Sequence, residues 1–431
     1  MDIFRISGGI PLSGSVSASG SKNACLPLLA ASLLIDGTVG LRRVPNLQDV
    51  RTMLHLLEHL GVQVCENSLL EEGVLALRAP EELLTFDTPY DMVRRMRASI
   101  CVLGPMLSRY GSATIALPGG CVFGDRPIDL HIKGLEALGA SIKMTHGVLH
   151  ATTQGQRLKG ARIALKSEFG STVLGTIQVM LAAVLAEGTT VIDFAAKEPE
   201  VICLAEFLNA SGARVYGAGT SHIRIDGVDK LSSCSFSVPA DRIEVSTLLA
   251  AGAITGGRVK VLNCSPDEVV SVTHMMRASG LSVVEEQNSV EVVSKGPLCP
   301  SSIKTSPYPG FPTDMQAQWM ALATQFDGQT VVEDTIYPER FMHVSELNRM
   351  GAKIRRKGQA AFVEGPVFLE GAEVMASDLR ASAALVLAGL VAQGETLIRR
   401  VYHLDRGYES LEEKIKLLGG RIERQVDDFN S

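Results

Sequence analysis

The chain repeats a two-glycine pattern six times. The first glycine of each repeat precedes a stretch rich in β-branched residues, and its positions, 66 to 77 residues apart, are Gly37, Gly111, Gly188, Gly256, Gly328 and Gly394. The second glycine lies 23 to 28 residues later and precedes another such stretch, at Gly61, Gly139, Gly212, Gly280, Gly351 and Gly419. Because two markers keep the same spacing over six periods, the sequence predicts a fold built from six copies of one unit.

Each repeat is expected to run helix, glycine stop, strand, helix, glycine stop, strand, since glycine commonly ends helices. The first helix of a repeat is apolar on nearly all sides, as in residues 381–391, so it must be buried. These features predict an α/β fold, a two-domain inside-out α/β barrel with helices buried and sheets outside. We expect three repeats in residues 21–235 and three in residues 1–20 plus 236–431, with the active site in the cleft between the domains.

Composition excludes several classes of protein. The 431 residues are 46% apolar with a net charge of -6, and no basic block suggests a nucleic-acid partner. No apolar run is long enough to span a membrane, and the first residues do not resemble a signal peptide. Eight cysteines without a C-x-x-C pair indicate a reducing cytoplasm. We therefore expect a cytoplasmic protein with no membrane or nucleic-acid partner.

One cysteine, Cys121, lies in a segment rich in glycine and proline, residues 117–127. Glycine frees the backbone and proline fixes the ends of the segment, an arrangement typical of a moving loop. Arg126 could favour the thiolate or hold an anion beside it. We find no His–Asp pair to activate the thiol for acyl transfer, so its chemistry is left open by the residues alone.

Charged residues recur where the buried helices should begin. Five of them precede the first glycine of their repeats by 14 or 15 residues, namely Lys22, Arg97, Arg242, Asp314 and Arg380. In the third repeat, Lys166 and residues 170–172 lie slightly further back. Lysine and arginine are poor choices near a helix N-terminus, which itself attracts anions. Their recurrence predicts a cationic pocket for a polyanionic substrate.

Seven motifs in order give the chain a family resemblance over essentially its whole length. They are Gly20-Ser21-Lys22-Asn23, Met96-Arg97-Ala98-Ser99, Pro118–Cys121 with Arg126–His131, Phe311–Gln316, Glu339–His343, Asp378–Ser382 and His403–Tyr408. With them the sequence resembles the UDP-N-acetylglucosamine 1-carboxyvinyltransferases, enolpyruvyl transferases of the EPSP synthase-like superfamily. That family has the two-domain, six-unit fold predicted above.

The resemblance implies a reaction and its partners. The enolpyruvyl group of phosphoenolpyruvate would pass to the 3-hydroxyl of UDP-N-acetylglucosamine through a tetrahedral intermediate, and phosphate would leave. This would be the first committed step of peptidoglycan synthesis. It implies no cofactor and no metal, and fosfomycin would alkylate the loop cysteine.

The resemblance also implies roles for individual residues. Cys121 would donate a proton to the methylene carbon and form an adduct with phosphoenolpyruvate, and Asp314 would be the general base. Lys22 and Arg406 would complete the catalytic set. The phosphoenolpyruvate site would comprise Lys22, Asn23, Arg126, Arg340, Arg380 and Arg406. The UDP-N-acetylglucosamine site would comprise Arg97, Arg126, Pro127, Ile128, Asp129, Leu130, Lys166, Ser167, Glu168, Phe169, Asp314 and Ile336.

Two positions depart from the family pattern. Glu168 stands where a small or hydroxyl residue is usual, and its carboxylate would repel a diphosphate. Asp125 also replaces a small residue, and it could pair with Arg126.

Three alternatives stay open at this point. The segment from His55 to His59 matches the H-x-x-E-H pattern of some zinc proteases, although no third ligand can be assigned. The shikimate-pathway enolpyruvyl transferase shares the fold and the mechanism but lacks the thiol loop. A catalytically inactive sugar-nucleotide sensor would keep the fold without the chemistry, and the intact acid, base and arginine set argues against it.

Overall fold

The chain forms two compact units. The computed structural model describes residues 2–65, 73–94, 96–117, 128–167 and 170–426. Unit 1 combines Met1–Ser19 with Ala240–Ser431, and unit 2 is Gly20–Pro239. Unit 2 ends four residues after residue 235, where its end was predicted. Strand β16 (Leu231–Ser237) crosses the predicted boundary, so the boundary cannot lie there. Unit 2 is therefore an insertion between two segments of unit 1.

The described residues contain six four-stranded sheets that share one pairing pattern. In every sheet an edge strand pairs in parallel with the second strand, and the remaining two pairs are antiparallel. Three of the sheets lie in each unit. The predicted six-repeat α/β architecture is thus confirmed.

Unit 2 holds the first three repeats. In sheet order its strands are β16, β3 (Ile35–Arg42), β5 (Val74–Arg78) and β4 (Gln63–Cys65); β6 (Asp87–Thr88), β7 (Ser112–Ala116), β9 (Val148–Thr152) and β8 (Ser141–Thr145); and β10 (Arg162–Ala164), β13 (Thr189–Asp193), β15 (His222–Asp226) and β14 (Arg214–Tyr216). Strands β11 (Lys166–Ser167) and β12 (Gly170–Ser171) form a separate pair. Its helices are α1 (Lys22–Ala31), η1 (Ser32–Leu34), α2 (Gln48–Leu60), α4 (Tyr90–Val93), η2 (Arg97–Val102), α5 (Leu103–Pro105), η3 (Met106–Tyr110), α6 (Asp129–Ala137), α7 (Val173–Ala183) and α8 (Pro199–Ala210).

Unit 1 holds the last three repeats. In sheet order its strands are β2 (Ser13–Ser17), β17 (Arg258–Leu262), β19 (Ser289–Val293) and β18 (Ser282–Glu286); β20 (Ile303–Lys304), β21 (Gly328–Glu333), β23 (Ala360–Gly365) and β22 (Lys353–Lys357); and β24 (Glu373–Met375), β25 (Glu395–Arg399), β1 (Asp2–Ser7) and β26 (Arg421–Val426). Its helices are α9 (Arg242–Ile254), η4 (Pro266–Glu268), α10 (Val270–Ala278), η5 (Thr313–Met315), α11 (Gln316–Ala323), α12 (His343–Arg349), α13 (Leu379–Val391), η6 (Val401–Arg406) and α14 (Leu411–Leu417).

The marker glycines are needed for their backbone conformation. The six glycines of the second marker adopt φ between +88° and +103°, and the six of the first marker also have positive φ. Gly61, for example, closes α2 in the left-handed conformation, which costs a glycine nothing sterically. The sequence repeat therefore marks twelve positions whose backbone conformation residues with a β-carbon rarely adopt.

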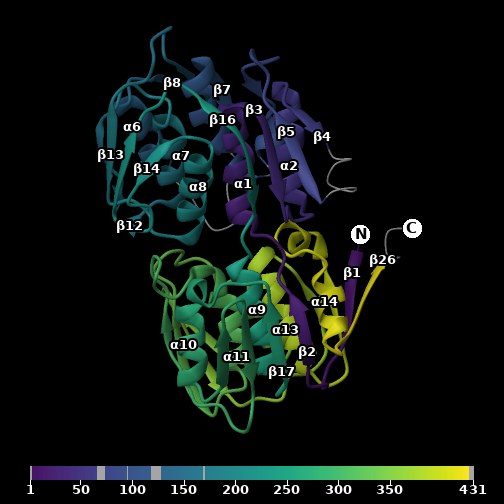
Figure 1. Cartoon of the computed structure of the whole chain (residues 1–431). Coiled ribbons are helices and arrows are strands. Elements are labelled where there is room, and N and C mark those ends of the chain that lie inside the picture. Colours follow the sequence, from purple (N-terminus) through teal and green to yellow (C-terminus); the bar gives the residue numbers. More distant parts are fainter. Residues whose placement is uncertain (1, 66–72, 95, 118–127, 168–169, 427–431) are drawn as a thin grey trace. The chain divides into compact units, whose positions relative to one another are not determined.

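The first helix of each repeat is buried, as its apolar circumference predicted. In unit 1, helices α9, α11 and α13 pack against one another, with strands of the unit's sheets around them (Figure 1). All residues of α13 from Arg380 to Leu390 are buried. In unit 2, η2 contacts both α1 and α7, and residues 175–183 of α7 are buried.

Two features differ from the predicted repeat. Two strands were predicted for each repeat, one after each marker glycine, but each sheet has four. The two missed strands are a hairpin partner and a parallel edge strand, and neither of them follows a marker glycine. The inner helix of the second repeat is broken into η2, α5 and η3. Pro105 lies inside it and cannot donate a backbone hydrogen bond, and Gly104 lies against the backbone of Gln178.

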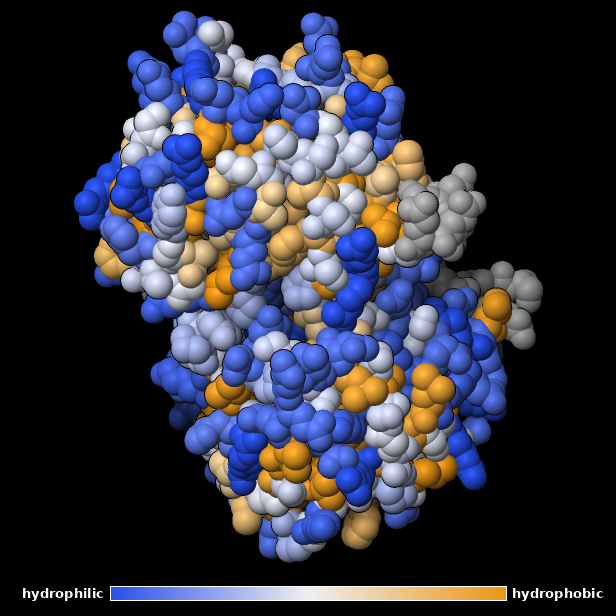
Figure 2. All heavy atoms as spheres, in the orientation of Figure 1, coloured by the Kyte–Doolittle hydropathy of each residue, from blue (hydrophilic) through white to orange (hydrophobic). Residues whose placement is uncertain are grey.

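The face drawn in Figure 2 has the mixed surface that is usual for a globular protein. On the face drawn in Figure 2, apolar side chains lie singly or in small groups among polar ones. Among the described residues, none of the helices combines the length and the hydrophobicity that crossing a membrane requires.

The core of unit 1 contains Trp319, the one tryptophan of the sequence. It is fully buried, it donates Nε1–H to the carbonyl of Ser301 at 3.0 Å, and it packs edge-on against Phe311 and Phe326 at 5.4 and 5.8 Å. The intrinsic tryptophan fluorescence of the protein therefore reports on the folding of unit 1.

We expect Phe326→Ala to lower the free energy of unfolding by about 3–5 kcal/mol, because it leaves a cavity beside Trp319. Urea titration followed by Trp319 fluorescence measures this change. Phe368→Ala is the matched control, since Phe368 is 87% exposed in the same unit. A loss of the same size in both variants would contradict this account of the core.

Candidate active site

In unit 1, one carboxylate is held between two buried arginines. Asp314 accepts hydrogen bonds from Nη1 of Arg340 at 2.7 Å and from Nη2 of Arg380 at 3.0 Å. The side chains of Arg340 and Arg380 are 7% and 2% exposed, whereas that of Asp314 is 28% exposed. We call these three residues the Asp314 cluster. The structure thus brings together three residues that the sequence predicted for catalysis and phosphoenolpyruvate binding.

Local backbone structure sets the position of Asp314. The buried carboxylate of Asp334 accepts hydrogen bonds from the hydroxyls of Thr305 and Thr313 and from the backbone N–H groups of Ile336 and Tyr337. Asp334 therefore fixes the residue before Asp314 together with the loop that contains Ile336, a residue predicted to contact the sugar nucleotide.

Arg380 enters the cluster from the start of a buried helix. Asp378 caps α13 by accepting from the backbone N–H groups of Arg380 and Ala381 at 2.9 and 3.1 Å. Burial opposes the charge on Arg380, yet the Asp314 carboxylate together with Tyr408 and Asp241 outweighs it and holds the pKa of Arg380 above its ordinary value. The guanidinium therefore stays charged inside the unit.

In unit 2, Lys22 occupies the start of α1. Its ammonium nitrogen lies 3.4 Å from the carboxylate of Asp49, and both side chains are mostly buried. Ser21 caps the helix by accepting from the backbone N–H of Ala24 at 3.2 Å. Asn23, the next predicted site residue, is the second residue of α1 and is half-buried.

Apart from Asp314 and Ile336 of unit 1, the described residues predicted for the sugar-nucleotide site lie on three elements of unit 2. Arg97 is the first residue of η2 and is half-buried. Ile128, Asp129 and Leu130 lie at the start of α6, and Lys166 and Ser167 form β11. The ammonium group of Lys166 lies 5.4 Å from the ring centre of Phe194, an exposed cation–π contact.

Several predicted residues lie outside the described residues, namely Cys121, Asp125, Arg126, Pro127, Glu168 and Phe169. Their predicted roles therefore stay predictions. Two others belong to unit 1: Arg406 ends η6 and is half-buried, and Arg242, the first residue of α9, lies 5.9 Å from the ring centre of Tyr308.

Two buried histidines near the predicted site residues were not assigned a role from the sequence. His131 on α6 is 3% exposed, and His343 at the start of α12 is 1% exposed. Burial lowers the pKa of each to about 4, with the charge of Arg97 adding to the effect on His131 and Asp378 opposing it on His343. Both residues belong to motifs quoted above, but only the tertiary structure shows that they are buried.

Buried thiols are unsuited to the chemistry predicted for Cys121. Burial raises the pKa of Cys25 and of Cys101 to about 12, so both stay protonated and unreactive at neutral pH. Cys65 and Cys299 are the exposed cysteines among the described residues. They are the natural controls for any experiment on Cys121.

The predicted zinc motif shows no metal-binding arrangement. His55 is exposed and contacts Glu58 of its own helix at 3.2 Å. No cluster of three or more His, Cys, Asp or Glu side chains suitable for a metal occurs in the part of the chain that the structure describes.

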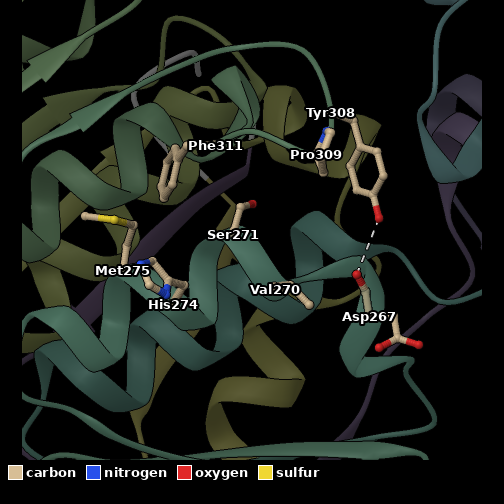
Figure 3. A pocket seen from close by; sticks show the side chains of 8 residues that line it. All are labelled: Asp267, Val270, Ser271, His274, Met275, Tyr308, Pro309 and Phe311. Carbon is tan, nitrogen blue, oxygen red and sulfur yellow. Dashed lines mark hydrogen bonds between the residues drawn. The ribbon is translucent and has the colours of Figure 1, made fainter. Parts of the chain in front are cut away.

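A surface hollow of unit 1 lies beside α10 (Figure 3). Its lining residues are Asp267, Val270, Ser271, His274, Met275, Tyr308, Pro309 and Phe311. None of them is a predicted site residue, although the segment that contains Phe311 continues to Asp314. We assign no role to this hollow.

The family model of EPSP synthase (3-phosphoshikimate 1-carboxyvinyltransferase) matches residues 6–415. The match covers most of the chain and agrees with the six-sheet fold, so the chain belongs to the EPSP synthase family. Solved structures agree on the fold. The enolpyruvyl transferase NikO from Streptomyces tendae is similar with a TM-score of 0.88 at 22% identity, over 99% of each chain. EPSP synthase from Acinetobacter baumannii is similar with a TM-score of 0.75 at 19% identity, over 99% of this chain and 100% of that one.

Relatives of higher identity narrow the assignment. The UDP-N-acetylglucosamine 1-carboxyvinyltransferase of Anaeromyxobacter sp. (strain Fw109-5) is 50% identical over 99% of this chain and 100% of its own length. UDP-N-acetylglucosamine 1-carboxyvinyltransferase 2 of Carboxydothermus hydrogenoformans is 51% identical over the same shares. Within the EPSP synthase family, the chain belongs with the UDP-N-acetylglucosamine 1-carboxyvinyltransferases.

We expect His343 to make the protein less stable as the pH falls. The folded pKa of about 4 lies below the ordinary value of 6.5, so between these pH values the unfolded chain binds more protons. The neutral, buried His343 contributes about 3 kcal/mol to the free energy of unfolding above pH 6.5. This contribution is lost as the pH falls towards 4. His343→Gln should therefore reduce the fall in unfolding free energy between pH 7 and pH 4.5.

Urea titrations at the two pH values, followed by Trp319 fluorescence, measure this difference in unit 1. His274→Gln is the control, because His274 is exposed on α10. An unchanged pH dependence in His343→Gln would show that the buried imidazole does not oppose unfolding in this way.

Proposed function

We propose that this chain transfers the enolpyruvyl group of phosphoenolpyruvate to the 3-hydroxyl of UDP-N-acetylglucosamine and releases phosphate. The observation that carries the proposal is full-length identity of about half with relatives named for this reaction. The reaction is the first committed step of peptidoglycan synthesis, and we place it in the cytoplasm.

The Asp314 cluster supports the proposed handling of a carboxylate substrate. Arg340 and Arg380 together bind one carboxylate, that of Asp314, through one hydrogen bond each. Guanidinium groups match planar carboxylates in charge and geometry. We infer that the same two arginines hold the carboxylate of phosphoenolpyruvate, while Lys22, Asn23, Arg126 and Arg406 hold its phosphate and the reacting region.

The proposed chemistry has two steps. In the addition, Cys121 gives a proton to the methylene carbon, Asp314 takes the proton of the sugar hydroxyl, and the hydroxyl oxygen bonds to the central carbon. In the elimination, the new methyl group returns a proton to the Cys121 thiolate and phosphate leaves, which restores the double bond and the thiol. The thiol also forms the phosphoenolpyruvate adduct implied by the family resemblance.

The proposed sugar-nucleotide site uses charge and shape from unit 2. Arg97 and Lys166 supply positive charge for the diphosphate, with Arg126 from the loop that contains Cys121. Residues 127–130, residues 167–169, Asp314 and Ile336 complete the proposed set of ligands. This assignment rests on the motifs and on the helix starts described above.

The test is phosphate release with both substrates present. Wild type should release phosphate, and Cys121→Ser should be slower by about 100-fold or more, because it loses a positioned proton donor. Cys299→Ser, which changes an exposed thiol, should keep wild-type activity. Equal rates for wild type and Cys121→Ser would refute the essential thiol.

Fosfomycin gives a second, independent readout. It should inactivate wild type, Cys65→Ser and Cys299→Ser by alkylating Cys121, and it should spare Cys121→Asp. Intact-protein mass after treatment shows the covalent addition directly. Inactivation of Cys121→Asp would place the reactive group elsewhere.

The shikimate enzyme is the second candidate, because the matching family model carries its name. The acceptor decides between the two. Phosphate release with UDP-N-acetylglucosamine and not with shikimate 3-phosphate supports the proposal, and the reverse supports the alternative. Release with neither acceptor would favour the inactive sensor.

A further inference from the structure

Three buried polar side chains meet behind the Asp314 cluster. They are Tyr408, Thr247 on α9 and Gln318 on α11, and we call them the tyrosine cluster. All three are buried to 99% or more. The hydroxyl of Tyr408 lies 2.9 Å from Oγ1 of Thr247 and 3.1 Å from Nε2 of Gln318. Each of the three side chains thus has a hydrogen-bond partner within the cluster, as buried polar groups generally do.

The hydrogen bonds of the tyrosine cluster form a directed chain. Gln318 donates from Nε2 to the hydroxyl of Tyr408, and the hydroxyls of Tyr408 and Thr247 share a hydrogen bond in which either oxygen can be the donor. We assign the phenol as the donor, because the single proton of the Thr247 hydroxyl goes to the carbonyl of Ile243. Thr247 in turn donates to the backbone carbonyl of Ile243 at 2.8 Å, which anchors the chain to α9. Burial raises the pKa of Tyr408, so the phenol keeps the proton that this chain needs.

The tyrosine cluster contacts two members of the Asp314 cluster. Gln318 also donates from Nε2 to the backbone carbonyl of Asp314 at 2.9 Å. The guanidinium carbon of Arg380 lies 5.3 Å from the ring centre of Tyr408, a cation–π contact away from water. Tyr408 is therefore linked to Asp314, the predicted general base, through Gln318. Its ring directly contacts Arg380, which is predicted to bind the carboxylate of phosphoenolpyruvate.

Tyr408 also fixes the segment that carries Arg406. Its backbone N–H donates to the carbonyl of Leu404 at 2.9 Å. Between them, Gly407 lies so close to Leu379 that a β-carbon would come within 2.5 Å of that side chain. The end of η6 is thus packed directly against the start of α13, one residue before Arg380.

We propose that Tyr408 is a positioning residue for enolpyruvyl transfer, which aligns Arg380 and Asp314 through the tyrosine cluster. This inference rests on the proposed function, because it takes the roles of Arg380 and Asp314 from it. Tyr408 does not touch the reacting atoms. Misplacing a substrate-orienting group by about 1 Å lowers a rate by about 100-fold in favourable cases.

The test is Tyr408→Phe, which removes the hydroxyl and keeps the ring beside Arg380. We expect kcat/KM for phosphoenolpyruvate to fall by about tenfold or more, within the range seen for lost positioning. The KM for UDP-N-acetylglucosamine should stay within about twofold, because the predicted nucleotide ligands lie mainly in unit 2. Tyr402→Phe is the matched control, since Tyr402 is 47% exposed in the same segment.

A second variant keeps the test decisive if Tyr408→Phe folds poorly. Thr247→Val is nearly isosteric and removes the acceptor of the phenol hydroxyl, so it should give the same selective loss. The double variant should lose little more kcat/KM for phosphoenolpyruvate than either single variant, because both substitutions break the same chain of hydrogen bonds.

Three results would overturn the inference. They are an unchanged kcat/KM for phosphoenolpyruvate in Tyr408→Phe, an equal rise in the KM values of both substrates, and a double variant whose loss of activity equals the sum of the two single losses in free energy. Wild-type activity is measured first. An inactive wild type would refute the proposed function, whereas an active wild type with unaffected variants refutes only the role of Tyr408.

Discussion

The burial of whole helices is the constraint on which the rest of unit 1 depends. Helices α9, α11 and α13 pack against one another, so a polar group along their length has no water to bind. The charged residues accordingly lie at the helix starts, as Arg380 does on α13. The polar residues further along, Thr247 and Gln318, bind each other and Tyr408. Inside-out packing thus decides where charge can be placed, and it concentrates that charge at one end of the helices.

The same constraint gives the Asp314 cluster its chemical character. An arginine buried without a partner is costly, and one carboxylate relieves two of them here. Asp314 is the most exposed member of the cluster, with 28% of its side chain exposed against 7% and 2% for the two arginines. A cluster of this type is suited to hold negative charge, and under the proposed function a carboxylate substrate would meet guanidinium groups that the protein structure has already oriented.

Much of this could be predicted from the sequence, because the repeat depends on backbone conformation. The marker glycines sit at positive φ, and those positions tolerate few other residues, so the fold left a regular trace. The helix starts were predictable for a similar reason, since Lys22 and Arg380 stand at a fixed distance from their markers. The hairpin strands left no such trace. Nor did the burial of His131 and His343, or the pairing of Asp314 with both arginines, because these follow from tertiary contacts between distant segments.

The first strands of the chain have a consequence for the order in which the protein forms. Strand β1 pairs with β25 and β26, and β2 pairs with β17, so residues 2–17 belong to sheets completed hundreds of residues later. During synthesis the whole of unit 2 leaves the ribosome before those partner strands have left it. Unit 2 therefore has the opportunity to fold first, while the N-terminal strands wait unpaired. Residues 2–17 are therefore among the last to form their native strand pairs, and their pairing is complete only when β26 has joined β1.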